Sequence, residues 1–458
     1  MTRSRRVLAA LGLDRAEARA WATYDWAISG MQSVVMAAVF PIYFVRVAAA
    51  DVPGAGATQL LARWNAIALA ISALVSPLLG AVADTRGAKK PFLALFTLLG
   101  AASCAAMFGI QRGDAVLAGA LFAACMVAGS AATTFYESLL PHVAPPGEMD
   151  RVSTAGFAVG YVGGGILLAL NLLWIQKPEW FGLPHGAGAS AAARTLPARL
   201  AFVSVAVWWI VFAVPIFRRV REPPRRLETG ERARAGTVRL AAARLLATLR
   251  ELRRHRHAAL MLVAFLVYND GIQTIIKMAA AYGAEIGIGT GALLAAILMV
   301  QFVGIPFSFL FGALAGRIGA KRAVLLGLAV YTAIAILGWR MTTAAEFFVL
   351  AGLVGVVQGG TQALSRSLFA SMIPPHRSGE LFGYWGVFEK FSGVLGPLAF
   401  DVVIAATGSS RSAVLAVIGF FAVGAALLWL VDVEAGRRAA IVEEAAARDA
   451  AARAPGPA

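Results

Sequence analysis

The chain contains twelve long apolar stretches, and no other feature constrains its fold as strongly. They lie at about 21–45, 60–83, 91–110, 114–140, 152–175 and 199–217, and then at about 258–284, 290–315, 323–341, 345–373, 380–406 and 411–431. An α-helix needs about 20 apolar residues to cross the hydrocarbon core of a bilayer. The sequence therefore predicts an all-α membrane protein with twelve transmembrane helices.

Composition and single-residue patterns exclude several other classes of protein. Apolar residues (AVILMFWYC) make up 59% of the 458 residues and charged residues 14%, against about 25% charged residues in a typical soluble domain. The two cysteines, Cys104 and Cys125, lie inside apolar stretches, and the five histidines are scattered. No metal site, cofactor site, nucleophile–base pair or phosphate-binding loop for ATP is indicated, so we do not expect an enzyme. The first twenty residues lack the apolar core of a signal peptide, so the first helix is expected to be retained.

The distribution of lysine and arginine predicts the orientation in the membrane. If the N-terminus lies inside the cell, segments on the cytoplasmic side hold 30 of the 41 Lys and Arg residues, and segments on the opposite side hold 8. Positively charged loops stay in the cytoplasm, so we expect a multi-pass protein of the cytoplasmic (inner) membrane with both termini cytoplasmic. This topology accounts for the net charge of +16, and a nucleic-acid partner is therefore not expected.

The apolar stretches divide the chain into two halves of six helices. The predicted segments are a cytoplasmic N-terminal segment at 1–20, an N-terminal six-helix bundle at 21–217, a basic linker at 218–257, a C-terminal six-helix bundle at 258–431 and a cytoplasmic tail at 432–458. The linker holds 13 arginines, and Val238, Ala242, Leu245 and Leu249 recur in it at helical spacing. Part of it is predicted to lie on the anionic inner leaflet as an amphipathic helix. The alternative is a solvated linker that only joins the halves.

A repeated motif indicates that the two halves share one plan. Residues 80–90 read GAVADTRGAKK, and residues 312–322 read GALAGRIGAKR. Six of the eleven positions are identical, and each motif follows the second helix of its half. We therefore expect two pseudo-symmetric six-helix bundles.

The form G-x-x-x-D-x-x-G-x-[KR]-[KR] and the layout of six plus six helices resemble the major facilitator superfamily of transporters. The resemblance covers nearly the whole chain and implies two halves that rock about a central site. It also implies a cytoplasmic gate, for which the motifs offer Asp84, Arg86, Lys89, Lys90, Lys321 and Arg322. The second motif has Gly316 in place of the aspartate, so the first is expected to carry most of the gating. The alternative is that the basic residues serve only membrane topology.

Two other stretches narrow the resemblance. Residues 24–27 read YDWA, with FPIYF at 40–44, and residues 358–367 read QGGTQALSRS, with FGY at 382–384 and Gly396-Pro397. Together they are similar to the vacuole-effluxer branch of the superfamily, the autophagy-related permeases and their bacterial relatives. This resemblance implies export of amino acids from a compartment in the fungal members. Ile28 departs from the pattern, because a small polar residue is expected after YDWA.

Polar side chains recur inside four of the predicted helices. The expected lining of a substrate pathway comprises Ser29, Gln32, Asn269, Gln273, Lys277, Gln358, Gln362 and Arg366, and Glu137 lies in the fourth helix. Spacings of three or four residues place such side chains on one helix face, and polar groups inside a membrane usually face a cavity or a partner. The first, fourth, seventh and tenth helices line the cavity in the superfamily that the chain resembles. The alternative is that these groups only hold helices together.

Three acidic residues inside helices are candidates for proton coupling. They are Asp270, which lies deepest, then Glu137, and then Asp25, for which a structural role near the cytoplasmic surface is an equal alternative. Glu137 and Arg366 occupy equivalent places if the fourth and tenth helices are symmetry mates. We predict that these two meet across the cytoplasmic part of the cavity in one conformation and form part of the gate. Swapping them should then restore transport that is lost in each single variant.

These patterns together predict a secondary active transporter of a small polar solute that works by alternating access. Amino-acid efflux is the leading case, with proton coupling as an option. One alternative is an exporter of other small molecules or drugs, and another is a membrane scaffold or sensor without transport. The expected partners are a small-molecule substrate and the lipid bilayer, and a monomer is the expected state.

Overall fold

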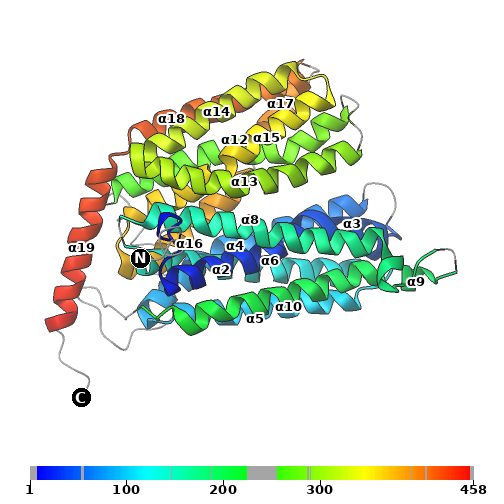
Figure 1. Cartoon of the computed structure of the whole chain (residues 1–458), viewed down its shortest axis with the longest axis horizontal. Coiled ribbons are helices and arrows are strands. Elements are labelled where there is room, and N and C mark those ends of the chain that lie inside the picture. Colours follow the sequence, from blue (N-terminus) through cyan, green and yellow to red (C-terminus); the bar gives the residue numbers. More distant parts are fainter. Residues whose placement is uncertain are drawn as a thin grey trace.

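Long helices that run side by side make up the computed structural model, in two groups that lie one above the other in Figure 1. The structure describes residues 8–52, 56–145, 147–186, 188–223, 255–285, 288, 290–393, 395–407 and 410–453. Within these residues every regular element is a helix, because a helix satisfies its backbone hydrogen bonds internally in a bilayer. Residues 224–254, which make up most of the linker and include its predicted amphipathic helix, fall outside the described residues.

The first group follows the order of the six predicted N-terminal helices. Its elements are α2 (Ala16–Met31), η1 (Gln32–Ala38), α3 (Val39–Tyr43), η2 (Phe44–Ala48), α4 (Gly56–Arg86), α5 (Lys89–Ala106), η3 (Met107–Gly109), α6 (Ala115–Ser138), α7 (Leu140–Val143), α8 (Met149–Gln176), η4 (Pro178–Phe181), α9 (Ala191–Arg194) and α10 (Leu196–Arg219). The first membrane helix runs from α2 to η2, and its η1 and η2 segments are π-helical. They flank Pro41 in α3, which has no N–H group to donate within the helix.

The second group follows the predicted C-terminal helices, with one interruption. Its elements are α12 (Arg256–Glu285), α13 (Thr290–Ile318), α14 (Ala320–Arg340), α15 (Ala344–Ser371), η5 (Pro375–Arg377), α16 (Ser378–Phe391), α17 (Leu395–Thr407) and α18 (Ser410–Trp429), followed by α19 (Val433–Arg453). Among the described helices, ten are long and apolar enough to cross a membrane, or eleven if α18 and α19 are counted together.

The expected single helix at 380–406 is the part of the twelve-helix prediction that needs correction. The structure has two shorter helices there, α16 and α17. Gly393 lies between them with a φ of 90°, a left-handed conformation that glycine adopts at little cost and that ends an α-helix. The apolar stretch is continuous in sequence, whereas the helix is not.

Two helix pairs make the most extensive contacts between the groups. The α4 helix packs along α16, and α8 packs along α13 (Figure 1). In each group, α4 and α13 are the second membrane helix, and α8 and α16 form all or part of the fifth. Each contact therefore joins the second helix of one group to the fifth helix of the other, as expected for two halves related by symmetry. This arrangement confirms the fold predicted from the sequence, an all-α membrane protein of two pseudo-symmetric bundles.

Glycines let α8 approach α2 closely beside the space between the groups. A Cβ atom at Gly160 would lie 2.7 Å from Ser29 Oγ, and one at Gly164 would lie 2.8 Å from Ser33 Oγ. Both distances are too short for a β-carbon, so the packing needs glycine at both positions. Gly160 and Gly164 are four residues apart, which places them on the same face of α8.

The tail helix α19 leaves α18 with a bend of 57° and lies at the end of the bundle that holds both chain termini, here called the termini side (Figure 1). Glu443 pairs with His255 at 3.0 Å, and Glu444 pairs with His376 at 2.8 Å. Burial would raise the pKa of Glu443, but the hydrogen bond from His255 and the nearby charges of His255, Arg377 and His376 lower it to about 2. These pairs hold the tail against the start of α12 and against η5.

Candidate functional site

A cavity of about 1230 Å³ lies between the two groups of helices. It reaches Arg46 and Arg194 at the end of the bundle away from the termini, here called the far side. Inward it continues to Glu137 and Arg366, which are only 4% and 2% exposed. Both groups contribute to the wall, so a rocking of one group against the other would change access to the cavity.

Most of the side chains expected to line a substrate pathway face this cavity. Its lining includes Ser29, Gln32, Gln273, Gln358, Gln362 and Arg366, together with Asp25 and Glu137. Asn269 is buried behind the lining, where its Oδ1 lies 3.5 Å from Gln362 Nε2 and its Nδ2 donates to Ser392 Oγ at 2.5 Å. The side chain of Lys277 lies outside the described part of the structure.

Arg366 and two carboxylates meet at the inner end of the cavity. Arg366 Nη1 lies 3.6 Å from Glu137 Oε1 and 3.6 Å from Asp25 Oδ2. The contact expected between Glu137 and Arg366 is therefore present, while its role as a gate stays a prediction. Asp25 is an additional partner that the helix symmetry did not indicate, and it also accepts a hydrogen bond from the Tyr136 hydroxyl at 2.8 Å.

The guanidinium of Arg366 is held by a shell from the N-terminal group. Its Nε donates to Ser153 Oγ and its Nη2 to the Ser153 carbonyl, both at 3.0 Å. The rings of Phe157 and Trp21 lie 4.6 and 4.9 Å from its Cζ, which adds cation–π attraction. A Cβ at Gly156 would lie 2.8 Å from Asp25 Oδ2, so only glycine fits beside the cluster.

Two charged residues of α16 complete the cluster. Glu389 and Lys390 both line the cavity although they are adjacent in sequence, and both act electrostatically on Glu137. The Oε2 atom of Glu137 is buried with no hydrogen-bond partner among the described residues, a costly state for an ionised oxygen. With Asp25 and Arg366 the cluster has three acidic and two basic side chains, so it is electrically balanced when it takes up one proton or one ammonium group.

Sequence reasoning missed two groups of this site. Gln301 lines the cavity from α13, but it is a lone amide in an otherwise apolar stretch, so no periodicity marked it. Ser153 holds Arg366 across the interface between the groups, and small hydroxyl residues are too common in membrane helices to be singled out.

Asp270 is not placed as expected for a proton carrier. It is fully buried, and its carboxylate accepts hydrogen bonds from the backbone N–H groups of Leu395 at 3.0 Å and Gly396 at 2.7 Å. These are the first residues of α17, so Asp270 caps that helix. Asn269, the preceding residue, bonds to Ser392 on the other side of the break. Adjacent residues of α12 thus hold both ends of the interrupted helix.

We expect Asp270→Asn to lower the free energy of unfolding by about 1–2 kcal/mol, because the amide keeps one acceptor but loses the negative charge at the helix N-terminus. Any dependence of transport on a pH gradient should persist. Thermal unfolding and gradient-driven transport in liposomes measure the two effects. A variant of unchanged stability that has lost its pH dependence would restore Asp270 as a proton carrier.

On the termini side, Asp84 closes the space between the groups. Its carboxylate accepts hydrogen bonds from the backbone N–H groups of Gly379 at 3.1 Å and Glu380 at 2.7 Å, in the first turn of α16. A carboxylate at a helix N-terminus is favoured by the helix dipole. A Cβ at Gly379 would lie 2.7 Å from Asp84 Oδ1, so a glycine is needed for this approach.

Lys89 joins the same contact from α5. Its Nζ lies 3.0 Å from Asp84 Oδ1 and donates to Ser378 Oγ at 2.5 Å, and Lys89 is only 3% exposed. Ser378 Oγ also donates to the Ser138 carbonyl at 2.8 Å. We call these residues, Asp84, Lys89, Ser378 and Gly379, the termini-side lock.

The other expected gate residues lie apart from the lock. Lys90 Nζ donates to the carbonyls of Phe217 and Val220 at the end of α10. Lys321 Nζ donates to the carbonyls of Trp429 and Val431 at the end of α18. Arg86 and Arg322 are exposed. Each motif thus supplies a lysine that ties its helix to the last helix of its own group, and the gating role expected for Arg86, Lys90, Lys321 and Arg322 stays a prediction. Asp84 and Lys89 alone have the lock geometry, since Gly316 replaces the aspartate in the second motif.

A carboxylate from the loop after α10 anchors the start of α5. Glu222 accepts hydrogen bonds from the backbone N–H groups of Lys89 at 2.6 Å and Lys90 at 2.9 Å. Partial burial raises the pKa of Glu222, and these hydrogen bonds oppose the rise. The lock helix is therefore fixed within its own group.

Comparisons with known proteins agree with this geometry. The chain matches the family model described as "Vacuole effluxer Atg22 like" over residues 58–441. It is 34% identical over 415 residues to the MFS-type transporter YxiO of Bacillus subtilis (strain 168), which covers 90% of this chain and 94% of that protein. It is 26% identical over 316 residues to autophagy-related protein 22 of Yarrowia lipolytica (strain CLIB 122 / E 150), which covers 63% of this chain. The match spans 51% of that fungal protein, about half its length.

Solved transporters of the major facilitator superfamily (MFS) share the fold. The proton:xylose symporter XylE superimposes with a TM-score of 0.66 at 13% identity, over 91% of this chain and 95% of that chain. FucP in its outward conformation superimposes with a TM-score of 0.66 at 12% identity, over 91% of this chain and 100% of that chain. At such low identity the likeness concerns the arrangement of helices.

Proposed function

The chain belongs to the Atg22-like vacuole effluxer family of MFS-type transporters, and we propose that it is a secondary active transporter that exports a small zwitterionic solute, with amino acids as the leading class. This proposal takes the protein as a monomer of the cytoplasmic membrane. It places both termini in the cytoplasm, as the 30 to 8 distribution of Lys and Arg supports. On that orientation the cavity opens outward and the termini-side lock is the cytoplasmic gate. The basic linker then faces the anionic inner leaflet.

The charge cluster at the inner end of the cavity carries this proposal. Arg366 and Lys390 can bind a carboxylate, and Glu137 and Glu389 can bind an ammonium group, all from the cavity wall. A cluster that pairs both signs of charge matches a zwitterion better than a sugar or an apolar drug, because a buried charge needs a partner of opposite sign. The amides of Gln32, Gln273, Gln358 and Gln362 add neutral hydrogen-bonding groups further along the wall.

Counterflow in liposomes tests the proposal directly. Purified protein is first screened with the twenty amino acids by thermal shift at two pH values. Liposomes are then loaded with each stabilising amino acid, and uptake of the same labelled compound is measured without any ion gradient. We expect uptake above that of protein-free liposomes and of the Arg366→Gln variant. If no amino acid exchanges while a sugar or an apolar drug does, the substrate class proposed here is wrong.

Proton coupling through Glu137 yields a separate prediction. Glu137→Gln fixes this side chain in a neutral form, so we expect transport driven by a pH gradient to fall by about 100-fold, as for the loss of a group that carries a proton. Counterflow, which needs no net proton movement, should continue at a reduced rate, because Glu389 remains in the cavity wall to bind the ammonium group. Glu389→Gln serves as the matched comparison on the other group of helices. If Glu137→Gln keeps its response to the gradient, the coupling site lies elsewhere.

A further inference from the structure

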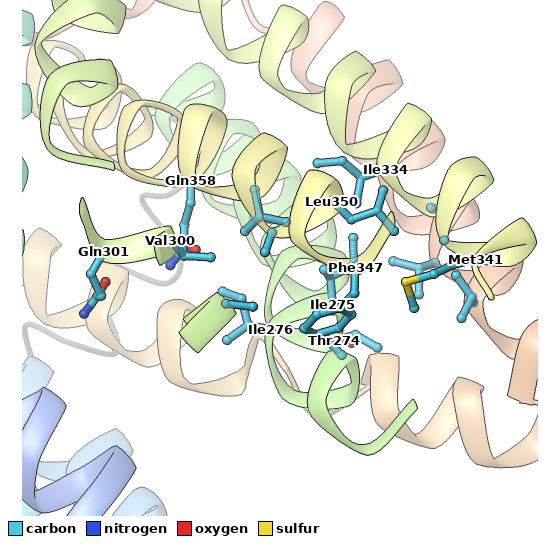
Figure 2. Close-up of a pocket in the computed structure, with 18 residues that line it drawn as sticks. Thr274, Ile275, Ile276, Val300, Gln301, Ile334, Met341, Phe347, Leu350 and Gln358 are labelled. Atoms are coloured by element: carbon cyan, nitrogen blue, oxygen red, sulfur yellow. The ribbon is translucent and has the colours of Figure 1, made fainter. Parts of the chain in front are cut away.

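A second pocket lies inside the C-terminal group of helices, apart from the charge cluster. Its volume is about 320 Å³, and its walls come from α12, α13, α14, α15 and α18. Figure 2 shows Ile334, Leu350, Phe347 and Ile275 around its middle, with Met341 towards one end. Helices of a single group line it, so it is a feature of this bundle, and only its two glutamines are shared with the cavity between the groups.

The pocket is apolar except at one end. Among its described lining residues, the polar side chains are Thr274, Gln301 and Gln358, and the Thr274 hydroxyl already donates to the Asp270 carbonyl at 2.7 Å. The two glutamines lie together at the end opposite Met341 (Figure 2). No charged side chain belongs to the described lining, and this lining favours an uncharged ligand because a buried charge needs a partner.

Small residues create the space. Ala335 and Gly338 of α14 and Ala351 of α15 line the pocket, where larger apolar residues would fill it. An apolar cavity of about 150 Å³ remains dry and binds benzene, and this pocket is about twice as large. Away from the glutamine end, the Thr274 hydroxyl is the one polar side chain of the described lining that could bond to water, so an apolar molecule is the better occupant. A mostly apolar pocket of this size with a few convergent polar groups is typical of a small-molecule site.

The glutamine end also opens towards the central cavity. Gln301 and Gln358 line both spaces, so the two are neighbours that share one pair of amides. A molecule in the pocket that hydrogen-bonds to these amides would remove them from the solute in the cavity. Binding at the two sites would therefore be mutually weakening.

We propose that this pocket binds an uncharged, largely apolar small molecule of about the size of a two-ring aromatic, with one hydrogen-bonding group directed at Gln301 and Gln358. Such a ligand would be an effector of the transporter rather than its cargo, because the pocket is separated from the charge cluster that the zwitterion needs. This pocket and its class of ligand differ from the site and the substrate of the proposed function.

Indole is a suitable probe, since it is uncharged, has two fused rings and has a single N–H donor. Purified full-length protein is titrated with indole, and binding is followed by calorimetry and by thermal unfolding. We expect saturable binding with a rise in Tm of about 2 °C at saturation. The readout is independent of transport, so it can succeed even if the amino-acid proposal fails.

Filling the pocket provides the decisive variant. Ala335→Leu places a larger apolar side chain in the empty space, so we expect a higher Tm without ligand and a loss of saturable indole binding. Ala329→Leu is the matched control, because Ala329 is an exposed alanine on the same helix and should leave both quantities unchanged. Ala351→Leu, from the opposite wall, repeats the test if Ala335→Leu does not fold. Saturable binding that survives both substitutions, or its absence in the natural protein, would overturn the proposal.

Discussion

Arg366→Gln is expected to lower the rate of transport by about 100- to 5,000-fold. The substitution leaves Asp25 and Glu137 facing each other without the cation that lies 3.6 Å from both. Removal of one partner from a buried charge pair costs about 3–5 kcal/mol, which corresponds to a factor of about 100 to 5,000. Initial rates of counterflow in liposomes measure the effect.

Two controls separate a site effect from misfolding. Size-exclusion profiles and thermal unfolding report whether Arg366→Gln retains its structure. Arg322→Gln is the matched variant, because Arg322 is exposed at the start of α14 and should transport at the natural rate. A folded Arg366→Gln protein with nearly normal counterflow would remove Arg366 from the substrate site.

The structure refines the expected rescue by a charge swap. Exchanging the residues in Glu137→Arg/Arg366→Glu restores one pair of opposite charges, but Asp25 remains and the shell of Ser153 and Trp21 is built around a guanidinium at position 366. We therefore expect partial rather than full recovery of counterflow relative to the single variants. No recovery at all, with both single variants folded, would contradict a gating pair.

Asp84→Ala is expected to open the termini side. In the structure Asp84 accepts two backbone hydrogen bonds from α16 and pairs with Lys89, all in a buried position. The substitution leaves the Lys89 ammonium without its carboxylate, at a cost to this conformation of about 3 kcal/mol or more. A change of that size shifts a two-state equilibrium by about 100-fold, so the closed form should lose its dominance.

Labelling of a single cysteine measures this shift. Ser138 lies next to the lock, where its carbonyl accepts a hydrogen bond from Ser378, and it is fully buried in the closed form. A Ser138→Cys substitution therefore places a thiol there, while Cys104 and Cys125 are buried elsewhere. A water-soluble maleimide should react with this cysteine much faster in the Asp84→Ala background. Lys321→Ala is the control, since Lys321 bonds only to carbonyls of its own group. Equal labelling rates in the Asp84→Ala and Lys321→Ala backgrounds would mean that Asp84 does not hold the gate.

Several parts of the fold and site could be predicted without coordinates. Gln358, Gln362 and Arg366 recur every four residues, so they had to share a helix face, and that face does line the cavity. The repeated motif indicated two equivalent bundles, and the corresponding α4–α16 and α8–α13 contacts agree. These predictions succeeded because they depend on helix periodicity and segment length, which are local properties of the chain.

Other assignments required the packed structure. Asp270 and Asp25 are both carboxylates in membrane helices, yet one is buried and caps α17, whereas the other is half-buried and faces Arg366. Lys89 and Lys90 are neighbours, yet one enters the lock and the other ties α5 to α10. A rotation of about 100° per residue separates adjacent side chains on a helix, so the partner of each is decided by which helices lie around it.

The sequence by itself determined that the chain is a helical membrane protein of two related halves with polar side chains in its interior. Exposing polar groups to lipid costs free energy within each membrane segment separately, so each segment can be assigned from its own residues. Only the tertiary structure decided that α16 and α17 are separate helices, that Ser153 and Asp25 hold Arg366, and that an apolar pocket lies beside the charged cavity. Each of these features joins residues far apart in the chain, and such contacts depend on how whole helices pack rather than on the order of residues within one helix.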